Sequence, residues 1–316
     1  MDDIIVDKKI SLYLLSGFLG AGKTTFLTNV LNDLTDEKVG VIMNEFGKIG
    51  IDGTLIARKG MELTEINRGS IFCSCLKNAF TSAMMEMADR DIQYLFVESS
   101  GLADPSNIGE VLSRVEAEKG PIVEYKGAIC MVDGVFFMEQ LKELETVERQ
   151  LKHCHLAVIS KADLVDHDHL STVKDRVGTI NPKIGIVEAA YGRINYDFLQ
   201  EDLMSSNWAK MEESTNTPEN KPKTIGLSYE GNISSEKLCS FLSLAAKDCH
   251  RIKGFCHVDG EWSQIDMVNE RMDIKPSKVE RMESNLVFLS KVGPNVIRTV
   301  ASAWQNEVGR EMKLSN

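Results

Sequence analysis

The stretch Ile10-Ser-Leu-Tyr-Leu-Leu-Ser-Gly17-Phe-Leu-Gly-Ala-Gly22-Lys-Thr-Thr25 decides the fold of this chain. It opens with an apolar run, Ile10–Leu15, of the kind that forms a buried strand. A glycine-rich turn follows, and then an amphipathic helix is predicted over Lys23–Leu34. The turn matches GxxxxGK[ST], a loop whose backbone N–H groups bind phosphate oxygens at the start of a helix. The sequence therefore predicts a strand, an anion-binding loop and a helix, in that order.

The residues of this phosphate loop have distinct expected roles. The glycines allow the backbone to turn closely around phosphates, and the ammonium group of Lys23 reaches the terminal ones. The hydroxyl of Thr24 is placed to bind Mg²⁺. The residues predicted to hold the nucleotide phosphates are Gly17, Gly20, Ala21, Gly22, Lys23, Thr24 and Thr25.

Strands and helices alternate through the first two thirds of the chain, which predicts an α/β domain with a mostly parallel sheet over residues 1–204. Apolar runs predict further strands at Val39–Met43, Tyr94–Val97, Ala128–Val132, Leu156–Ile159 and Ile184–Val187. Amphipathic stretches predict helices at Lys77–Asp89, Val135–Leu151 and Leu170–Val177.

A polar segment, residues 205–223, predicts a linker, because it holds few large apolar side chains that could join a core. Residues 224–316 are expected to form a second, small α+β domain. Its predicted strands are Thr224–Tyr229, Lys253–Val258, Glu261–Met267 and Leu286–Lys291. Its predicted helices are Ser234–Asp248 and Pro294–Val308.

A carboxylate, Glu98, follows the predicted strand Tyr94–Val97. In a sheet that carries a phosphate loop, an acid at the end of a neighbouring strand holds Mg²⁺. Gly101 lies three residues further on and can bring its N–H to the γ-phosphate. We therefore predict that Lys23, Thr24, Glu98 and Gly101 form the catalytic centre.

The sequence Ser160-Lys161-Ala162-Asp163 follows another predicted strand and resembles the [NT]KxD base-reading motif of GTPases. There the Asp carboxylate accepts hydrogen bonds from guanine, which adenine cannot donate, while the Lys stem packs on the ring. Ser160 replaces the usual Asn or Thr, which is expected to weaken a structural hydrogen bond. The loop Ala189–Gly192 is predicted to add a backbone contact to the base.

Together these motifs resemble the CobW-like family of GTPases, which act as metal chaperones or insertases. The resemblance covers nearly the whole chain. It rests on SGFLGAGKTT (Ser16–Thr25), NEFG (Asn44–Gly47), ESSGLADP (Glu98–Pro105), SKADL (Ser160–Leu164) and RIKGF (Arg251–Phe255). It implies a Ras-like P-loop GTPase domain followed by a small α+β domain. It also implies that Asn44–Asp52 is a first switch loop, with Asp52 a partner of Mg²⁺ or of the γ-phosphate.

The family's CxCC metal motif is altered here. The corresponding stretch, Gly69–Cys75, keeps Cys73, gains Cys75 and has serine and phenylalanine where two cysteines are expected. Thiolates two residues apart in an extended loop can face one side and hold Zn²⁺ or a similar ion at about 2.3 Å. The resemblance nominates Glu45 as a third ligand. Burial of both cysteines as packing residues is the alternative.

Several other His and Cys residues could bind Zn, Co or Ni. The pairs His153/His155 and His167/His169 each have i, i+2 spacing, but a strand approach and an exposed helix start explain them better than metal binding does. No spacing among the cysteines and histidines of the second domain matches a zinc motif. Cys130 is predicted to be a core residue.

The composition excludes some classes of protein. The chain of 316 residues has 36 Lys and Arg against 47 Asp and Glu, a net charge of −11, which argues against a nucleic-acid binder. Its apolar runs are too short to span a bilayer. Seven scattered cysteines and an acidic N-terminus indicate a reducing cytoplasm rather than secretion.

The sequence therefore predicts a GTPase that uses GTP and Mg²⁺ and delivers a transition metal, Zn²⁺ or Co²⁺, to a client metalloprotein. No Gln or Arg is obviously placed to activate water, so slow intrinsic turnover is expected. Two alternatives stay open: a GTP-dependent switch that binds a client without handling metal, and a P-loop kinase or ATPase. The metal, the client and a possible homodimer are left undetermined.

Overall fold

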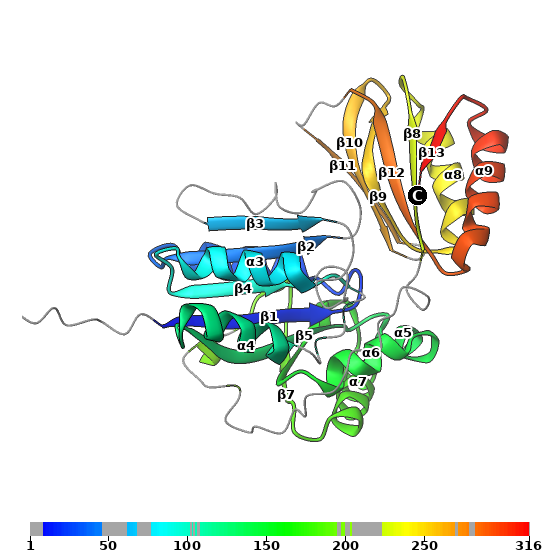
Figure 1. Cartoon of the computed structure of the whole chain (residues 1–316). Helices are drawn as coiled ribbons and strands as arrows, with labels where there is room; N and C mark the ends of the chain where they lie inside the picture. Colours follow the sequence, from blue (N-terminus) through cyan, green and yellow to red (C-terminus); the bar gives the residue numbers. More distant parts are fainter. Residues whose placement is uncertain are drawn as a thin grey trace, which may run out of the picture. The chain divides into compact units, whose positions relative to one another are not determined.

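The chain divides into two compact units, residues 1–218 and 219–316. The computed structural model describes residues 9–45, 62–67, 77–101, 103, 105, 108–194, 197–199, 203, 223–268, 271–277 and 282–315 (Figure 1). The predicted linker lies outside these residues, apart from Lys223. No helix in the described ranges has the length and apolar character that crossing a membrane requires.

The first unit is built on a seven-stranded sheet with the order β3-β2-β4-β1-β5-β6-β7, and every pairing is parallel. The strands are β1 (Ile10–Gly17), β2 (Val39–Glu45), β3 (Glu62–Asn67), β4 (Tyr94–Glu98), β5 (Val123–Asp133), β6 (Leu156–Ser160) and β7 (Gly185–Glu188). Because all strands run in one direction, their carboxyl ends, and the loops that follow, share one edge of the sheet.

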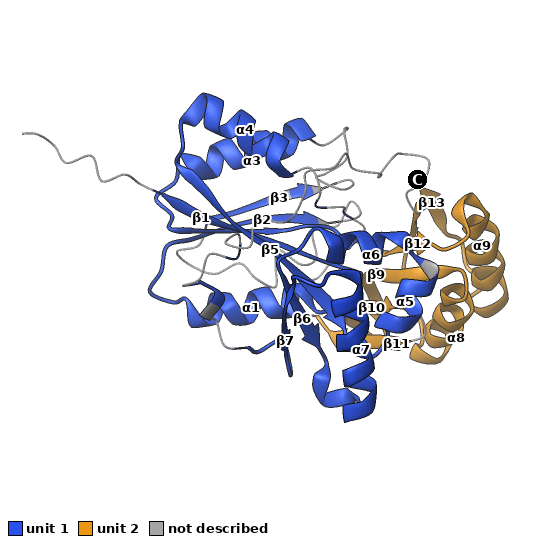
Figure 2. Cartoon of the chain, turned by 90° about the horizontal axis from the view of Figure 1, so that it is seen from below, with its two compact units in different colours: residues 1–218 blue, residues 219–316 orange. Residues whose placement is uncertain are grey.

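Helices cover both faces of this sheet, since its strands are buried on both sides. They are α1 (Lys23–Asp33), α3 (Lys77–Ala88), α4 (Ile108–Lys119), α5 (Phe137–Glu143), α6 (Glu145–Lys152) and α7 (His167–Ile180). Figure 2 shows α3 and α4 on one face and α1 on the other. On the α1 face, Phe26 and Val30 pack in one core with Tyr13 and Phe96, whose rings stack at 5.6 Å.

The second unit is a six-stranded antiparallel sheet with the order β11-β10-β9-β12-β8-β13. Its strands are β8 (Thr224–Tyr229), β9 (Cys249–Val258), β10 (Glu261–Val268), β11 (Arg271–Pro276), β12 (Ser284–Ser290) and β13 (Lys313–Ser315). The helices α8 (Ser235–Ala246) and α9 (Val296–Glu307) lie against one face (Figure 1). The core between them holds Trp304, Phe241 and Phe288, with Phe241 edge-on to Trp304 at 5.0 Å.

The predicted fold class, an α/β sheet followed by a small α+β unit, is confirmed, and individual elements differ. The helix predicted over Val135–Leu151 is wrong as a single element, because Leu144 is extended and separates α5 from α6. The helix predicted from Pro294 begins at Val296, after a short 3-10 turn. Among the α-helices and strands that the structure describes, four were not predicted: β3, α4, β11 and β13.

Candidate functional site

The phosphate loop joins β1 to α1 with the tight geometry that its sequence predicts. Gly17, Gly20 and Gly22 have φ angles of 125°, 76° and 92°, a region that side chains rarely adopt. A Cβ on Gly17 would lie 2.3 Å from the carbonyl oxygen of Met131 on β5, so only glycine fits there. The absence of a side chain on Gly17 therefore allows the loop to lie close to β5.

The ammonium group of Lys23 lies inside this loop. Its side chain is buried, with 7% of the residue exposed, and Nζ donates to the carbonyl oxygens of Gly17 at 2.7 Å and Phe18 at 3.0 Å. These bonds place a positive charge within the curve of the loop. Phosphate oxygens entering the loop would meet this charge and the start of α1 together.

Thr24 and Glu98, predicted from separate motifs, are brought together at the carboxyl edge of the sheet. Thr24 Oγ1 donates to Glu98 Oε1 at 3.2 Å, and Glu98 is 6% exposed. A hydroxyl and a carboxylate offer hard oxygen ligands, which is the donor type that Mg²⁺ prefers. These two residues therefore fit a Mg²⁺ ion, and their role in holding it stays a prediction.

The segment after Glu98 is fixed to neighbouring strands. The Ser99 N–H and hydroxyl both lie within hydrogen-bond distance of the Leu15 carbonyl, at 2.9 and 3.0 Å. Asn44, at the end of β2, accepts from the Ser100 N–H at 3.4 Å and donates to the Ile66 carbonyl of β3 at 3.1 Å. The buried Asn44 carboxamide therefore connects the ends of β2, β3 and β4. The NEFG motif in the sequence did not reveal this role.

The Ser160–Asp163 loop is tied to the phosphate loop. Ser160 Oγ lies 2.8 Å from the Ala21 carbonyl oxygen and 3.1 Å from that of Val132. The hydrogen bond from Ser160 to Ala21 therefore has an ordinary length. The weakening expected from the replacement of Asn or Thr by serine is not seen in this distance. The two loops form one connected edge.

Lys161 is oriented by a residue that sequence reasoning missed. Lys161 Nζ donates to Asp133 Oδ2 at 2.6 Å, and the Asp133 side chain is fully buried. Its other oxygen accepts from the N–H groups of Val135 and Phe136. The sequence signal that could have identified Asp133 is an acidic residue directly after the apolar run Ala128–Val132. Asp163 follows in an exposed turn, where its carboxylate is open to a ligand.

The loop Ala189–Gly192 joins this edge through backbone contacts. The Ala189 carbonyl accepts from the Ala162 N–H at 3.3 Å, next to Asp163. Asn29 on α1 donates to the carbonyl of Tyr191 at 2.8 Å, and Tyr191 is 78% exposed with φ 53°. The loop after β7 is thus anchored to both the base-reading loop and the helix of the phosphate loop. The predicted backbone contact to a base stays a prediction.

Residues 11–188, more than half of the chain, match the family described as CobW/HypB/UreG, nucleotide-binding domain. The chain belongs to this family. Residues 223–299 also match the cobalamin synthesis protein cobW C-terminal domain. The parallel sheet of the first unit therefore belongs to the nucleotide-binding domain of a CobW/HypB/UreG protein.

Relatives of this CobW/HypB/UreG chain include proteins with metal-related names. The zinc chaperone YjiA of Escherichia coli strain K12 is 28% identical over 280 residues, covering 81% of this chain and 84% of YjiA. The zinc-regulated GTPase metalloprotein activator 1 of Dictyostelium discoideum is 24% identical over 58% of this chain, which spans 46% of that protein. The crystal structure of Zn(II)-bound YjiA GTPase from E. coli aligns over 96% of this chain and 99% of that one, with 21% identity and a TM-score of 0.47.

The candidate transition-metal ligands of this CobW-type chain are mostly outside the described residues. Cys73, Cys75 and Asp52 lie there, and Glu45 ends β2 with a side chain that is not described. Among the residues that are described, no group of three His, Cys, Asp or Glu side chains could hold a metal ion. The Cys73/Cys75 site therefore stays a prediction.

The histidine pairs have structural contacts. His155 is buried, and its Nδ1 accepts from the Ala128 N–H at 3.0 Å. His167 begins α7 and is exposed, while His169 Nε2 lies 2.9 Å from the Gly134 carbonyl oxygen. The contacts of His155 and His169 fix a strand end and a helix end. They agree with the structural explanation of the two pairs rather than with metal binding. Cys130 is 2% exposed in β5, as predicted.

In the second unit of the CobW/HypB/UreG chain, an ion pair and a close backbone approach join neighbouring strands. Arg251 on β9 forms a two-bond ion pair with Asp266 on β10, at 3.0 and 2.8 Å. A Cβ on Gly254 would lie 1.9 Å from the Asn285 carbonyl oxygen, so glycine allows β9 and β12 to approach. Burial raises the pKa of Cys256 to about 12 and keeps its thiol protonated.

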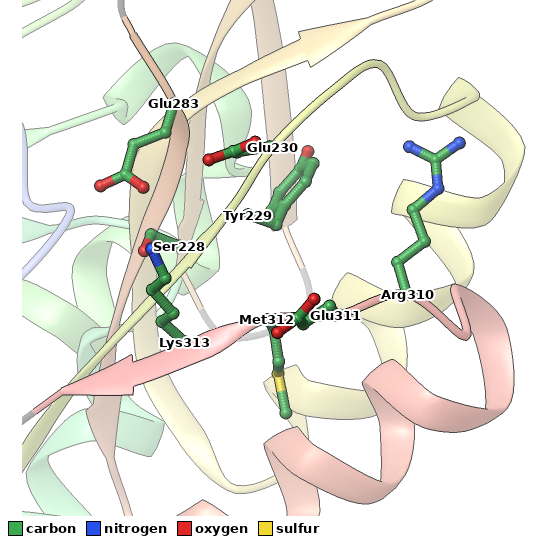
Figure 3. Close-up of a pocket in the computed structure, with 8 residues that line it drawn as sticks. All are labelled: Ser228, Tyr229, Glu230, Glu283, Arg310, Glu311, Met312 and Lys313. Carbon is green, nitrogen blue, oxygen red and sulfur yellow. The ribbon is translucent and has the colours of Figure 1, made fainter.

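A cavity of about 460 Å³ lies in the second unit beside β8 and β13 (Figure 3). Its lining residues come from β8, the start of β12 and the segment between α9 and β13. They are Ser228, Tyr229, Glu230, Glu283, Arg310, Glu311, Met312 and Lys313. Three of them are acidic, but no metal-binding group occurs in the described part of the chain. The cavity is therefore not a candidate metal centre.

Proposed function

We propose that this chain is a GTP-hydrolysing metallochaperone, a switch that delivers a transition metal to a client metalloprotein. The observation that carries the proposal is the convergence of three elements at one sheet edge. Glu98 and the Ser160–Asp163 loop each form a hydrogen bond to the phosphate-loop motif, Glu98 with Thr24 and Ser160 with Ala21. A kinase or ATPase would need the first two elements and has no use for the third.

Different residues would bind different parts of the nucleotide's phosphates and the Mg²⁺ ion. Lys23 exchanges its two carbonyl contacts for terminal phosphate oxygens, and the N–H groups of the loop surround the phosphates. Thr24 and Glu98 are the residues that would hold Mg²⁺, which supplies positive charge to the β- and γ-phosphates. The N–H of Gly101 meets the γ-phosphate. Hydrolysis removes that group, so the segment after Glu98 loses this contact and keeps its hydrogen bonds to Leu15 and Asn44.

Guanine specificity is assigned to Asp163. Its exposed carboxylate accepts from two guanine donors, and the Lys161 stem, held by Asp133, lies beside the ring. Each charge-assisted hydrogen bond of this type contributes roughly 1.5–3 kcal/mol. GTP should therefore bind at least an order of magnitude more tightly than ATP. Slow turnover is expected because no described Gln or Arg is assigned to activating water.

The metal and the client are proposed from family membership and from the names of relatives. Zinc appears in the names of YjiA and of the Dictyostelium activator, so Zn²⁺ is the first cargo to test. Cys73 and Cys75 supply thiolates, and Glu45 adds a carboxylate from within the proposed switch loop Asn44–Asp52. Movement of Glu45 with the nucleotide state would change metal affinity. A switch that binds its client without metal is the second candidate, because the family's cysteine motif is altered.

Nucleotide competition tests the GTPase assignment. A fluorescent GDP analogue bound to the protein should be displaced by GTP at concentrations at least tenfold lower than by ATP. The variant Asp163→Asn should lose this preference and bind xanthosine triphosphate more tightly than GTP. Equal displacement by ATP and GTP in the parent protein would reject the proposal.

Metal titration separates the two candidate functions. A Cys73→Ala/Cys75→Ala double variant should lose stoichiometric Zn²⁺ while it keeps the parent's GTP affinity. The matched control is Cys239→Ala, which removes a half-buried thiol of α8 in the second unit. If the double variant binds Zn²⁺ and Co²⁺ as tightly as the parent in both nucleotide states, the metal-free client switch becomes the better description.

A further inference from the structure

A buried glutamine on α6 holds the segment that follows Glu98. Gln150 is 1% exposed, and its Nε2 donates to the carbonyl oxygens of Gly101 at 3.2 Å and Ala103 at 3.0 Å. Two acceptors face the same nitrogen, so the orientation of the carboxamide is fixed by its partners. Gln150 is 49 residues away in sequence from Gly101, and no motif identifies it.

Gly101 is enclosed on its other side by the phosphate loop. A Cβ on Gly101 would lie 2.7 Å from the backbone nitrogen of Leu19, a distance that real Cβ atoms do not adopt. Gly101 thus stands between Leu19 and Gln150. Because Glu98 already contacts Thr24, this segment is positioned against the phosphate loop by its own contacts.

The helix that carries Gln150 is itself fixed to the base-reading side. Asn181, at the end of α7, donates to the carbonyls of Leu151 at 2.8 Å and Cys154 at 3.1 Å. β6 begins at Leu156, two residues after Cys154, and ends at Ser160, whose hydroxyl contacts the phosphate loop. The donor on Gln150 therefore stands on a rigid support that also carries the base-reading loop.

We propose that Gln150 is a positioning residue that holds Gly101 where its N–H meets a γ-phosphate, and so sets the preference for GTP over GDP. The argument rests on the proposed GTP site. With the donor removed, two buried carbonyl oxygens lose their partner and the segment moves away from Leu19. GTP loses the Gly101 contact, whereas GDP, which has no γ-phosphate, loses nothing comparable.

Two variants test this inference. Gln150→Met keeps an unbranched side chain of similar size and removes the donor, and Gln150→Glu replaces the amide nitrogen by a carboxylate oxygen. We expect the ratio of GTPγS affinity to GDP affinity to fall about tenfold in Gln150→Met at pH 8, the effect of losing about one buried hydrogen bond. The fold of each variant is checked by thermal unfolding without nucleotide.

The pH dependence separates a positioning role from a structural one. Burial raises the pKa of a carboxyl group, and a protonated carboxyl can donate one hydrogen bond. The ratio in Gln150→Glu, normalised to the parent, should therefore recover as the pH falls from 8 to 6. Gln150→Met should show no recovery over this range. A general loss of stability would lower both affinities together and leave the ratio unchanged.

The matched control is Gln140→Met on the adjacent helix α5. Gln140 is also buried, at 3% exposure, but its Nε2 has no hydrogen-bond partner among the described residues. Its variant should keep the parent's ratio. A ratio in both Gln150 variants equal to that of Gln140→Met, or shifted towards GTP, overturns the inference. Failure of the parent to bind GTPγS would instead reject the proposed GTP site itself.

Discussion

The two sheets of this chain use polar residues in different ways. In the parallel sheet, Glu98 and Ser160 end their strands, and they form hydrogen bonds to Thr24, in the first turn of α1, and to Ala21 of the phosphate loop. In the antiparallel sheet, Arg251 and Asp266 stand within strands and pair with each other across β9 and β10. Parallel strands bring their following loops to one edge, where separate motifs can combine into a site. An antiparallel ladder instead pairs polar side chains on its own face.

This contrast predicts that substitutions in one unit leave the other unaffected. Changes at the loop edge should alter nucleotide binding with little effect on the second unit. Changes in the antiparallel sheet should lower its stability and leave nucleotide affinity intact. Hydrogen exchange monitored by mass spectrometry reports on the two units separately and can detect any coupling.

The largest expected effect follows Lys23→Ala. The substitution removes the positive charge from the curve of the phosphate loop, so GTP hydrolysis should fall by about 10²–10³-fold, as for other lost electrostatic contacts to a reacting group. Phosphate release measures this loss. Hydrogen exchange in β8–β12 should match the parent, and a change there would contradict the independence of the two units.

Gly254→Ala is the corresponding change in the antiparallel sheet. The added Cβ would lie 1.9 Å from the Asn285 carbonyl oxygen, so β9 and β12 must separate. We expect a loss of about 3 kcal/mol in the stability of the second unit, at the upper end for overpacking. Urea unfolding followed by hydrogen exchange measures it. Gly260→Ala is a control for glycine removal, because a Cβ there meets no atom within 4 Å, although φ 90° adds its own strain.

Acid should weaken the second unit through His250. Burial, and then the charge of Lys291, lower the pKa of His250 from 6.5 to about 4. Between these values the unfolded chain binds the proton and the folded chain does not, so stability falls as the pH falls from 6.5 to 4. The expected loss of stability is about 3 kcal/mol. His250→Asn should show a flatter pH profile, and identical profiles would exclude this histidine as the cause.

Ser160→Ala should have the smallest effect. It removes the hydroxyl that joins the base-reading loop to Ala21, a loss of about 1 kcal/mol, so GTP affinity should fall several-fold. Ser160→Thr keeps the hydroxyl and should retain most of the affinity. Isothermal titration with GTP compares the two. Equal losses in both variants would show that the size of the side chain, rather than its hydroxyl, matters.

The buried strands could be predicted from sequence, whereas three of the four edge strands in the two described sheets could not. The fourth, β7, carries the apolar run Ile184–Val187 and was predicted. Runs such as Ile10–Leu15 are apolar because both faces of the parallel sheet are covered. β3, β11 and β13 stand at sheet edges and carry many polar residues, so no apolar run marks them. The break at Leu144 has neither Pro nor Gly to indicate it, and only the extended backbone there separates α5 from α6.

The same distinction applies to the site. Residues proposed to contact a ligand belong to short motifs whose spacing is fixed by the chemistry, so Lys23, Thr24 and Glu98 could be nominated from the sequence. Residues that hold those motifs in place come from distant parts of the chain. Asn44 was placed in a motif without its function, and Asp133 and Gln150 were missed, because long-range hydrogen bonds leave no local pattern.

The carbonyl contacts of Lys23 bear on how fast a nucleotide leaves. A buried ammonium group without partners is unstable, and in many sites that instability would slow the departure of a bound phosphate. Here the Gly17 and Phe18 carbonyls can accept its hydrogen bonds at 2.7 and 3.0 Å as the phosphate departs. The lysine ammonium group therefore changes hydrogen-bond partners without an interval in which it has none. We expect GDP to dissociate spontaneously, with no exchange factor needed to stabilise the emptied loop.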